Sequence, residues 1–148
     1  MDTSKWIAPV YSEFGITQWG WRVNHRENFK MSDNARVGSF TSIDARYGVE
    51  IQDDVIIGQG CVITSYSRIS GKSGKTTLKK GCKIGAQAII GPGVTIGENA
   101  IIGANSYVDE DVPAGEVWHG TPAKYVNAIN RMNKERPSIY PDHPRMPL

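Results

Sequence analysis

"CKIGAQAIIGPGVTIGENAIIGANSYV", residues 82–108, is the stretch that decides the fold of this 148-residue chain. Isoleucine precedes glycine at 84–85, 90–91, 96–97 and 102–103, so the pattern repeats every six residues. A strand pattern repeats every two residues and a helix pattern about every 3.6 residues, so this period indicates short strands joined by regular corners. Three repeats form a coil of about 18 residues with three faces. The segment therefore predicts an all-β fold, a parallel β-helix whose coils stack at the ~4.8 Å spacing of neighbouring strands.

The same repeat extends over most of the chain and predicts the core. Its first position holds a large aliphatic residue and its fifth position mostly a small one, an alternation that fills a narrow interior. The large residues are Ile57, Ile63, Leu78, Ile84, Ile90, Ile96, Ile102 and Val108, and the smaller ones are Cys61, Ser67, Cys82, Ala88, Val94, Ala100, Ser106 and Val112. A weaker pattern runs upstream through Met31, Val37, Ile43 and Val49, slips by two residues at "RYGVEI" and resumes at Ile51. We interpret the slip as a small corner bulge.

One insertion interrupts the repeat between Ile63 and Leu78. These residues are 15 positions apart, three more than two repeats, so "SGKSGK" at 70–75 is predicted to bulge outward as a short loop over residues 70–76. With this count Cys61 stacks beneath Cys82, and both cysteines fit core thiols better than a metal or redox pair.

The two ends do not follow the repeat. Residues 1–30, with Trp6, Trp19 and Trp21, are predicted to cap the open end of a β-helix that spans residues 31–120. Pro122, followed by apolar residues at helical spacing, predicts a C-terminal α-helix over residues 121–134. The proline-rich residues 135–148 are predicted to be irregular. We expect a single domain.

Composition excludes several classes of partner. A formal charge of +2 with 22% charged residues gives no polycationic face for nucleic acid. No apolar run approaches the ~20 residues of a membrane span, and the first residues do not have the pattern of a secretory leader. We therefore expect a cytoplasmic protein with no nucleic-acid or membrane partner.

The repeats together with "DVPAGEVWHGTPAKYV" (residues 111–126) resemble the hexapeptide-repeat acyltransferases, of the sugar and xenobiotic acetyltransferase type. The resemblance implies a left-handed β-helix, although the general rule for parallel crossovers favours the right-handed form. It also implies a homotrimer with active sites between subunits. The activity it implies is transfer of an acyl group, usually acetyl, from coenzyme A to a hydroxyl or amine of a small molecule. Acetyl-CoA is then the donor and a sugar or nucleotide-linked sugar the acceptor, with no metal expected.

Stacking with the insertions counted places Asp44, Thr64, Gly85 and Gly103 in one column, and Ala45, Ser65, Ala86 and Ala104 in the next. From the resemblance, Gly85, Ala86, Gly103 and Ala104 are the expected groove for the pantetheine arm, although tight corners require small residues in any case. Lys124 matches the family's basic residue near the cofactor phosphates. Asp109 and Glu110 depart from the family pattern, and their charges would repel phosphates there.

The residues expected to bind the acceptor are the polar ones, at the N-terminal end of these columns. Many O-acetyltransferases of the family carry a catalytic histidine where this chain reads "ITSYSRIS" (63–70), and its absence favours an amine acceptor, which is already a nucleophile. Asp44 is the first candidate for orienting the amine or accepting its proton, with a corner-cap role as the alternative. His25 is the other candidate base, and His119 is expected to pack or to touch the adenine side. Expected substrate contacts are Thr64, Ser65, Tyr66 and Arg68.

Two other functions are compatible with such a fold. A trimeric scaffold without activity would explain the missing histidine. A γ-type carbonic anhydrase needs three histidines that converge on zinc, and His25, His119 and His143 do not have that arrangement in the repeat. The loop "SGKSGKT" (70–76) lacks the spacing of a phosphate-binding loop.

Overall fold

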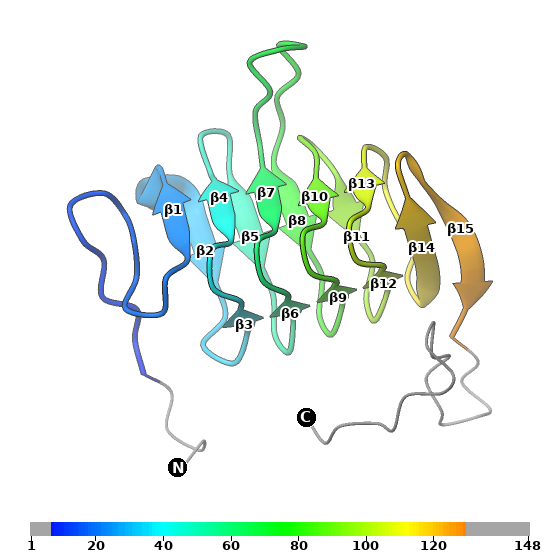
Figure 1. The fold of residues 1–148 in the computed structure, drawn as a ribbon, viewed down its shortest axis with the longest axis horizontal. Coiled ribbons are helices and arrows are strands. Elements are labelled where there is room, and N and C mark those ends of the chain that lie inside the picture. Colours follow the sequence, from blue (N-terminus) through cyan, green and yellow to red (C-terminus); the bar gives the residue numbers. More distant parts are fainter. Residues whose placement is uncertain (1–6, 130–148) are drawn as a thin grey trace.

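The computed structural model describes residues 7–129, which form a parallel β-helix with three sheets along the sides of a prism (Figure 1). The first sheet contains β1 (Arg22–Asn24), β4 (Ser42–Asp44), β7 (Val62–Thr64), β10 (Ile89–Ile90) and β13 (Tyr107–Val108). The second contains β2 (Phe29–Met31), β5 (Val49–Ile51), β8 (Thr76–Leu78) and β11 (Thr95–Ile96). The third contains β3 (Arg36–Val37), β6 (Ile56–Ile57), β9 (Lys83–Ile84), β12 (Ile101–Ile102), β14 (Glu116–Gly120) and β15 (Ala123–Ala128). A 3-10 turn, η1 (Arg26–Asn28), joins β1 to β2.

The core is the predicted column of large and small inward residues. All eight large residues from Ile57 to Val108 are at most 3% exposed. Of the smaller set, Ser67 lies in a loop and is half-buried, while the other seven are buried. The parallel β-helix predicted from the period of six is therefore confirmed.

Coil lengths follow directly from the strand pairs. Ile43 pairs with Ile63, Ile63 with Ile90, and Ile90 with Val108, which are offsets of 20, 27 and 18 residues. The predicted two-residue slip at "RYGVEI" is confirmed by the first offset. The third is the regular coil of three repeats.

The offset of 27 residues corrects the predicted size of the loop. Ile63 lies on the first sheet and Leu78 on the second, so the chain turns only one corner between them. The insertion is therefore nine residues rather than three, and the β7–β8 connection that contains it, residues 65–75, forms an outward loop that rises above the other corners (Figure 1). Cys61 consequently stacks on Ala88 and Cys82 on Val55, so the predicted Cys61–Cys82 stack is wrong.

The predicted helix over residues 121–134 is wrong for the part that the structure describes. Ala123–Ala128 is the strand β15, which runs antiparallel to β14. Because β14 is the last parallel strand of the third sheet, its outer edge carries unpaired backbone groups, and a returning strand satisfies them where a helix would not. Residues 130–148, with the rest of that helix and the tail, lie outside the described residues.

The N-terminal end of the prism is closed by aromatic residues. Trp21 is 2% exposed and makes edge-to-face contacts with Tyr11 at 6.1 Å and Phe29 at 6.4 Å between ring centroids. β1 already pairs with β4, so the β-helix begins at Arg22, earlier than the expected residue 31. Only residues 7–21 precede the first coil in the described structure, and Trp6 lies outside it.

We expect Leu78→Ala to lower the free energy of unfolding by about 2–5 kcal/mol, because it removes a fully buried side chain from a column with no space to collapse. Its neighbour Thr77 points outward from the same strand, so Thr77→Ala is the matched control and should cost less than about 1 kcal/mol. Thermal and chemical denaturation measure both. Equal losses for the two variants would contradict the inward register of β8.

Candidate active site

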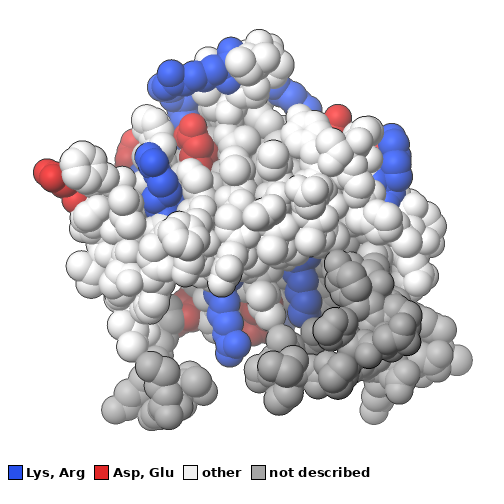
Figure 2. Space-filling view, viewed as in Figure 1, with Lys and Arg blue, Asp and Glu red and all other residues white. Residues whose placement is uncertain are grey.

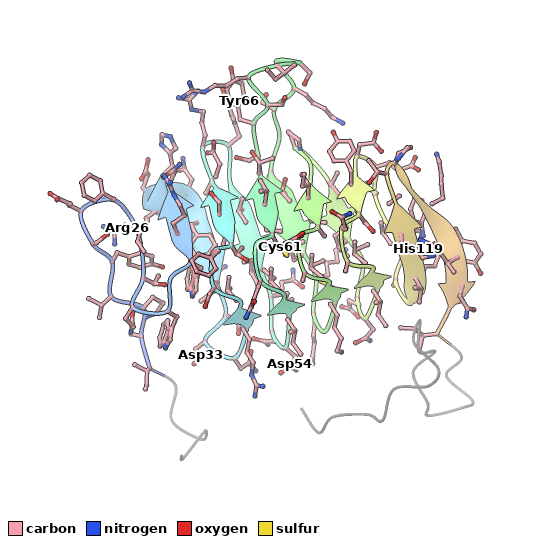
Figure 3. All side chains as sticks on the ribbon, viewed as in Figure 1. Arg26, Asp33, Asp54, Cys61, Tyr66 and His119 are labelled. Carbon is pink, nitrogen blue, oxygen red and sulfur yellow. The ribbon has the colours of Figure 1, made fainter. Side chains whose placement is uncertain are left out.

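Three corners run along the edges of the prism, and they hold most of the polar side chains considered for function. The first corner joins the first sheet to the second, the second corner joins the second sheet to the third, and the third corner joins the third sheet to the next strand of the first. Figure 3 shows Tyr66 on the loop of the first corner and His119 near the far end of the coil stack.

The first corner brings His25, Asp44 and Thr64 onto consecutive coils. Asn24, Asp44 and Thr64 pair in register across β1, β4 and β7, and His25 follows Asn24 directly. His25 adopts a left-handed backbone conformation (φ 61°), and its Nδ1 lies 3.4 Å from Oε1 of Glu27. It also borders an open depression of about 1260 Å³ that lies between the first coil and residues 11–16.

Asp44 caps its corner and keeps one carboxylate oxygen without a partner among residues 7–129. Its Oδ1 accepts a hydrogen bond from the backbone amide of Arg46 at 3.1 Å, so the carboxylate does cap its corner. The side chain is nevertheless partly exposed, and Oδ2 accepts no hydrogen bond from residues 7–129. One oxygen thus fixes the orientation while the other faces the surroundings of the corner.

Thr64 and Ser65 are committed to the backbone of the corner. Ser65 is fully buried, and its Oγ donates to the Asp44 carbonyl at 2.8 Å and accepts from the amide of Tyr47 at 2.9 Å. Thr64 Oγ1 donates to the Tyr66 carbonyl at 2.7 Å and accepts from the Tyr66 amide at 3.1 Å. The structure therefore gives Ser65 the role of holding the loop rather than the expected substrate contact.

Tyr66 belongs to an aromatic cluster at the start of the loop. Its ring centroid is 5.6 Å from that of Tyr47, and Cζ of the Arg46 guanidinium lies 5.0 Å from the Tyr66 centroid. Arg68 is exposed on the same loop. Tyr47 was not among the functional residues predicted from the sequence. The two-residue slip at this corner, which contains Tyr47, was the signal that could have identified it.

At the third corner the backbones of successive coils nearly touch. Gly38, Gly58, Gly85 and Gly103 form the column, and a Cβ on Gly85 would lie 2.5 Å from the amide nitrogen of Ala104. The same addition on Gly58 would lie 2.7 Å from the Ala86 nitrogen. Glycine is therefore required here by stacking, whether or not a cofactor lies alongside, while Ala86 and Ala104 are exposed.

The hairpin of β14 and β15 places Lys124 beside the end of this glycine column. Lys124 pairs with His119 across β15 and β14, and Cβ of His119 would lie 2.6 Å from a Cβ on Gly103. Both side chains are exposed. The structure thus brings Gly85, Gly103 and Lys124 to one edge of the prism.

The single predicted column from Asp44 to Gly103 is wrong, because it depended on the shorter loop. Thr64 is followed along its corner by Gly91 and then Asp109, whereas Gly85 stacks on Gly58. The expected acceptor and cofactor residues therefore occupy two different corners, one on each side of the first sheet. The acidic pair at 109–110 lies on the first corner, away from the glycine column.

The two cysteines are free thiols buried in the core. Burial raises the pKa of the Cys82 thiol to about 12, and burial also raises the pKa of Cys61, against smaller opposing contributions from nearby hydrogen-bond donors. Within residues 7–129, no three His, Cys, Asp or Glu side chains are grouped closely enough to hold a metal ion. In the same range, no helix is long and apolar enough to cross a membrane.

The slim prism of six-residue repeats is similar to the hexapeptide-repeat transferases. Two models of that class match the chain, "Bacterial transferase hexapeptide (six repeats)" at residues 75–110 and "Hexapeptide repeat of succinyl-transferase" at residues 33–65. A UDP-3-O-acylglucosamine N-acyltransferase of Methylorubrum extorquens (strain PA1) is 42% identical over 90 residues, which are 61% of this chain and 24% of the relative. The chain thus matches about a quarter of that relative's length.

Solved structures agree with these matches. A hexapeptide-repeat acetyltransferase of Vibrio cholerae, complexed with acetyl coenzyme A, superposes with a TM-score of 0.70 at 22% identity, covering 74% of this chain and 65% of that one. A galactoside acetyltransferase in complex with coenzyme A gives a TM-score of 0.62 at 27% identity, covering 80% and 68%. The all-β prism of this chain matches a left-handed β-helix, the fold expected from the resemblance. These matches support the resemblance to the hexapeptide-repeat acyltransferases.

We expect Gly85→Ala to destabilise the folded chain by about 1–3 kcal/mol, because the added methyl group meets backbone rather than a movable side chain. Ala86→Ser, which adds an atom at the neighbouring exposed position, is the control and should change stability by less than about 0.5 kcal/mol. The melting temperatures of the purified variants without ligand test this. An unchanged melting temperature for Gly85→Ala would mean that stacking does not require glycine there.

Proposed function

We propose that this protein is an acyl-CoA-dependent acyltransferase that acetylates an amino group, or alternatively a hydroxyl group, of a sugar or nucleotide-linked sugar. The site lies in the cleft between two subunits of a homotrimer. Asp44 and Tyr66 on the first corner of one subunit face the track of Gly85, Ala86, Gly103 and Ala104 on the third corner of its neighbour.

The observation that carries this proposal is the position of the two residue groups on opposite edges of the first sheet. One prism cannot bring its own two edges together. In a closed threefold arrangement with the first sheet facing the axis, however, the first corner of each copy lies beside the third corner of the next. The outer face of that sheet carries Val62, Ile89 and Tyr107 in adjacent positions, all three exposed in the single chain, which supports burial of this face.

The third corner suits a thioester donor with a long flexible arm. The exposed methyl groups of Ala86 and Ala104 leave the backbone accessible, and their amides donate to no acceptor within residues 7–129. Amides of this kind can hydrogen-bond the amide groups of a pantetheine arm. Lys124 at the end of the track supplies a cation for the phosphates of the cofactor.

The first corner suits transfer to an amine. The amine nitrogen attacks the thioester carbonyl, the carbon–sulfur bond breaks, and the amine proton passes to the Asp44 carboxylate and from there to the departing thiolate. The M. extorquens relative is an N-acyltransferase acting on a UDP-linked glucosamine, which supports this acceptor class. The galactoside acetyltransferase supports the hydroxyl alternative, for which His25 is the candidate base.

The competing proposal is a trimeric scaffold without activity, and binding of the donor separates the two. A ligand that binds only the folded state increases the free energy of unfolding, by about 2.7 kcal/mol at a concentration 100 times Kd, and so raises the melting temperature. We expect acetyl-CoA at millimolar concentration to stabilise the protein. No shift would favour the scaffold.

Free-thiol release can be assayed with a panel of amino sugars, nucleotide-linked amino sugars and plain sugars. With amine acceptors we expect Asp44→Asn to lower kcat by about 10²–10⁴-fold, because it removes the proton acceptor. His25→Ala should retain kcat within about threefold with the same acceptors. If only hydroxyl acceptors react and His25→Ala abolishes the reaction, the amine mechanism is wrong and His25 is the base.

A mixing experiment tests whether each site is shared between subunits. Asp44→Asn damages the first corner and Ala104→Trp obstructs the third, so each variant alone should be inactive. After the two are unfolded and refolded together, every mixed trimer contains one site with both corners intact, and random 1:1 assembly should restore about a quarter of wild-type activity. Refolding each variant alone is the control. No recovery, with mixed trimers demonstrated by mass spectrometry, would contradict a shared site.

A further inference from the structure

The first corner carries a raised group of aromatic and cationic side chains that the proposed transfer step does not use. We call Arg46, Tyr47, Tyr66, Arg68 and Lys72 the loop crest. Tyr47 and Tyr66 lie on consecutive coils, and the other three surround them on the same corner and its loop. In Figure 2, Lys and Arg side chains follow the top of the molecule, where Figure 1 places the loop between β7 and β8.

Tyr47 presents a fixed and accessible ring. Its backbone amide is held by Ser65 Oγ at 2.9 Å, and the next residue, Gly48, donates its amide to the Ala45 carbonyl at 3.0 Å. The Tyr66 ring supports it from one side at 5.6 Å between centroids, yet Tyr47 remains 51% exposed. A large aromatic side chain that is held in place but half uncovered is suited to stacking against a planar ligand.

The charge of the loop crest is uncompensated. The chain has no aspartate or glutamate between Asp54 and Glu98, while this stretch contains six lysines and arginines. Within residues 7–129, no carboxylate lies within 4.0 Å of a side-chain nitrogen of Arg46, Arg68 or Lys72. Lys72 Nζ lies 3.5 Å from the Asp109 carbonyl oxygen, and the Arg46 guanidinium lies over the Tyr66 ring. These cations therefore have donors available for an anionic ligand.

The carboxylates of this corner lie at its two ends. Asp44 is turned toward the Arg46 amide, Glu27 lies beside His25 on the first coil, and Asp109 and Glu110 follow β13 beyond the loop. Glu50, on the outer face of the second sheet, pairs with Lys30 and Lys75. The loop crest between them is positive and aromatic.

We propose that the loop crest binds a nucleoside diphosphate, with the base stacked on Tyr47 and the diphosphate held by Arg46 and the loop cations Arg68 and Lys72. Guanidinium groups bind phosphate oxygens in pairs of hydrogen bonds, and base stacking on aromatic rings requires no particular base. This inference rests on the proposed function, since it assigns part of the ligand of the same cleft. Two sources offer this chemistry, the nucleotide of a nucleotide-linked acceptor and the nucleotide end of coenzyme A held by the neighbouring subunit.

The test is calorimetric binding of UDP and of coenzyme A, each alone and in the presence of the other, to the full-length protein. We expect Tyr47→Ala to raise the Kd of one of these ligands roughly tenfold or more, and Tyr47→Phe, which keeps the ring, to change it less than about threefold. Arg46→Ala should weaken the same ligand and reduce the dependence of its Kd on salt. Lys30→Ala is the charge control, because Lys30 is a cation on the outer face of the second sheet and lies outside the loop crest. Melting temperatures of all variants show whether the fold is kept.

The outcomes separate the two sources and the two proposals. If UDP binds together with coenzyme A and Tyr47→Ala weakens only UDP, the loop crest holds the acceptor nucleotide. If only coenzyme A is weakened, it holds the cofactor nucleotide of the neighbour. If folded Tyr47→Ala and Arg46→Ala bind both ligands as the wild type does, the inference is overturned, even when acetyl-CoA stabilises the protein and thiol release occurs. Absence of both acetyl-CoA binding and thiol release would instead overturn the proposed function.

Discussion

The close approach of backbones at the third corner is the contact on which the rest of the structure depends. Successive coils stack there with glycine on glycine, and the space left over is smaller than a methyl group at Gly38, Gly58 and Gly85. This spacing fixes the height of every coil, and therefore the strand pairing on all three faces. It also makes the third corner smooth, because residues that must lack side chains for packing leave accessible backbone beside them. The same constraint that builds the prism thus prepares the surface that we assign to the donor.

The first corner is not subject to this requirement for close backbone approach, and the chain departs from its six-residue repeat there. The coils that contain Asp44 and Thr64 are 20 and 27 residues long, against 18 for the next one. The extra residues cannot enter the core, since its column of aliphatic side chains is already filled, so they project outward. Buried hydroxyl groups then hold the projecting backbone, as Ser65 does for Tyr47 and Asp44. Polar and aromatic side chains accumulate at this edge because additions are tolerated there.

The sequence was sufficient for the fold class and for the inward residues, but not for the relation between faces. The interval from Ile63 to Leu78 fits two repeats with three extra residues, or one repeat with nine. Both solutions bury Leu78, so the hydrophobic pattern cannot distinguish them, and only the strand pairing shows that one corner is turned. All predicted columns that crossed this interval shifted accordingly, which separated Asp44 and Thr64 from Gly85 and Gly103. The predicted C-terminal helix depended on the apolar spacing of Tyr125, Val126 and Ile129, but Tyr125 and Val126 are exposed on β15, and backbone pairing with β14 decides the structure there.

That separation has a functional consequence. Within residues 7–129, large and small side chains from all three faces fill the core of the β-helix, and its flat faces do not enclose a ligand. In the trimer that we propose, a site with walls on both sides forms between prisms, at the edges that carry the polar residues. Because both edges border the first sheet, one closed arrangement about that sheet forms all the clefts together. Assembly and activity would then be coupled, since the single chain holds each half of the site on a separate edge.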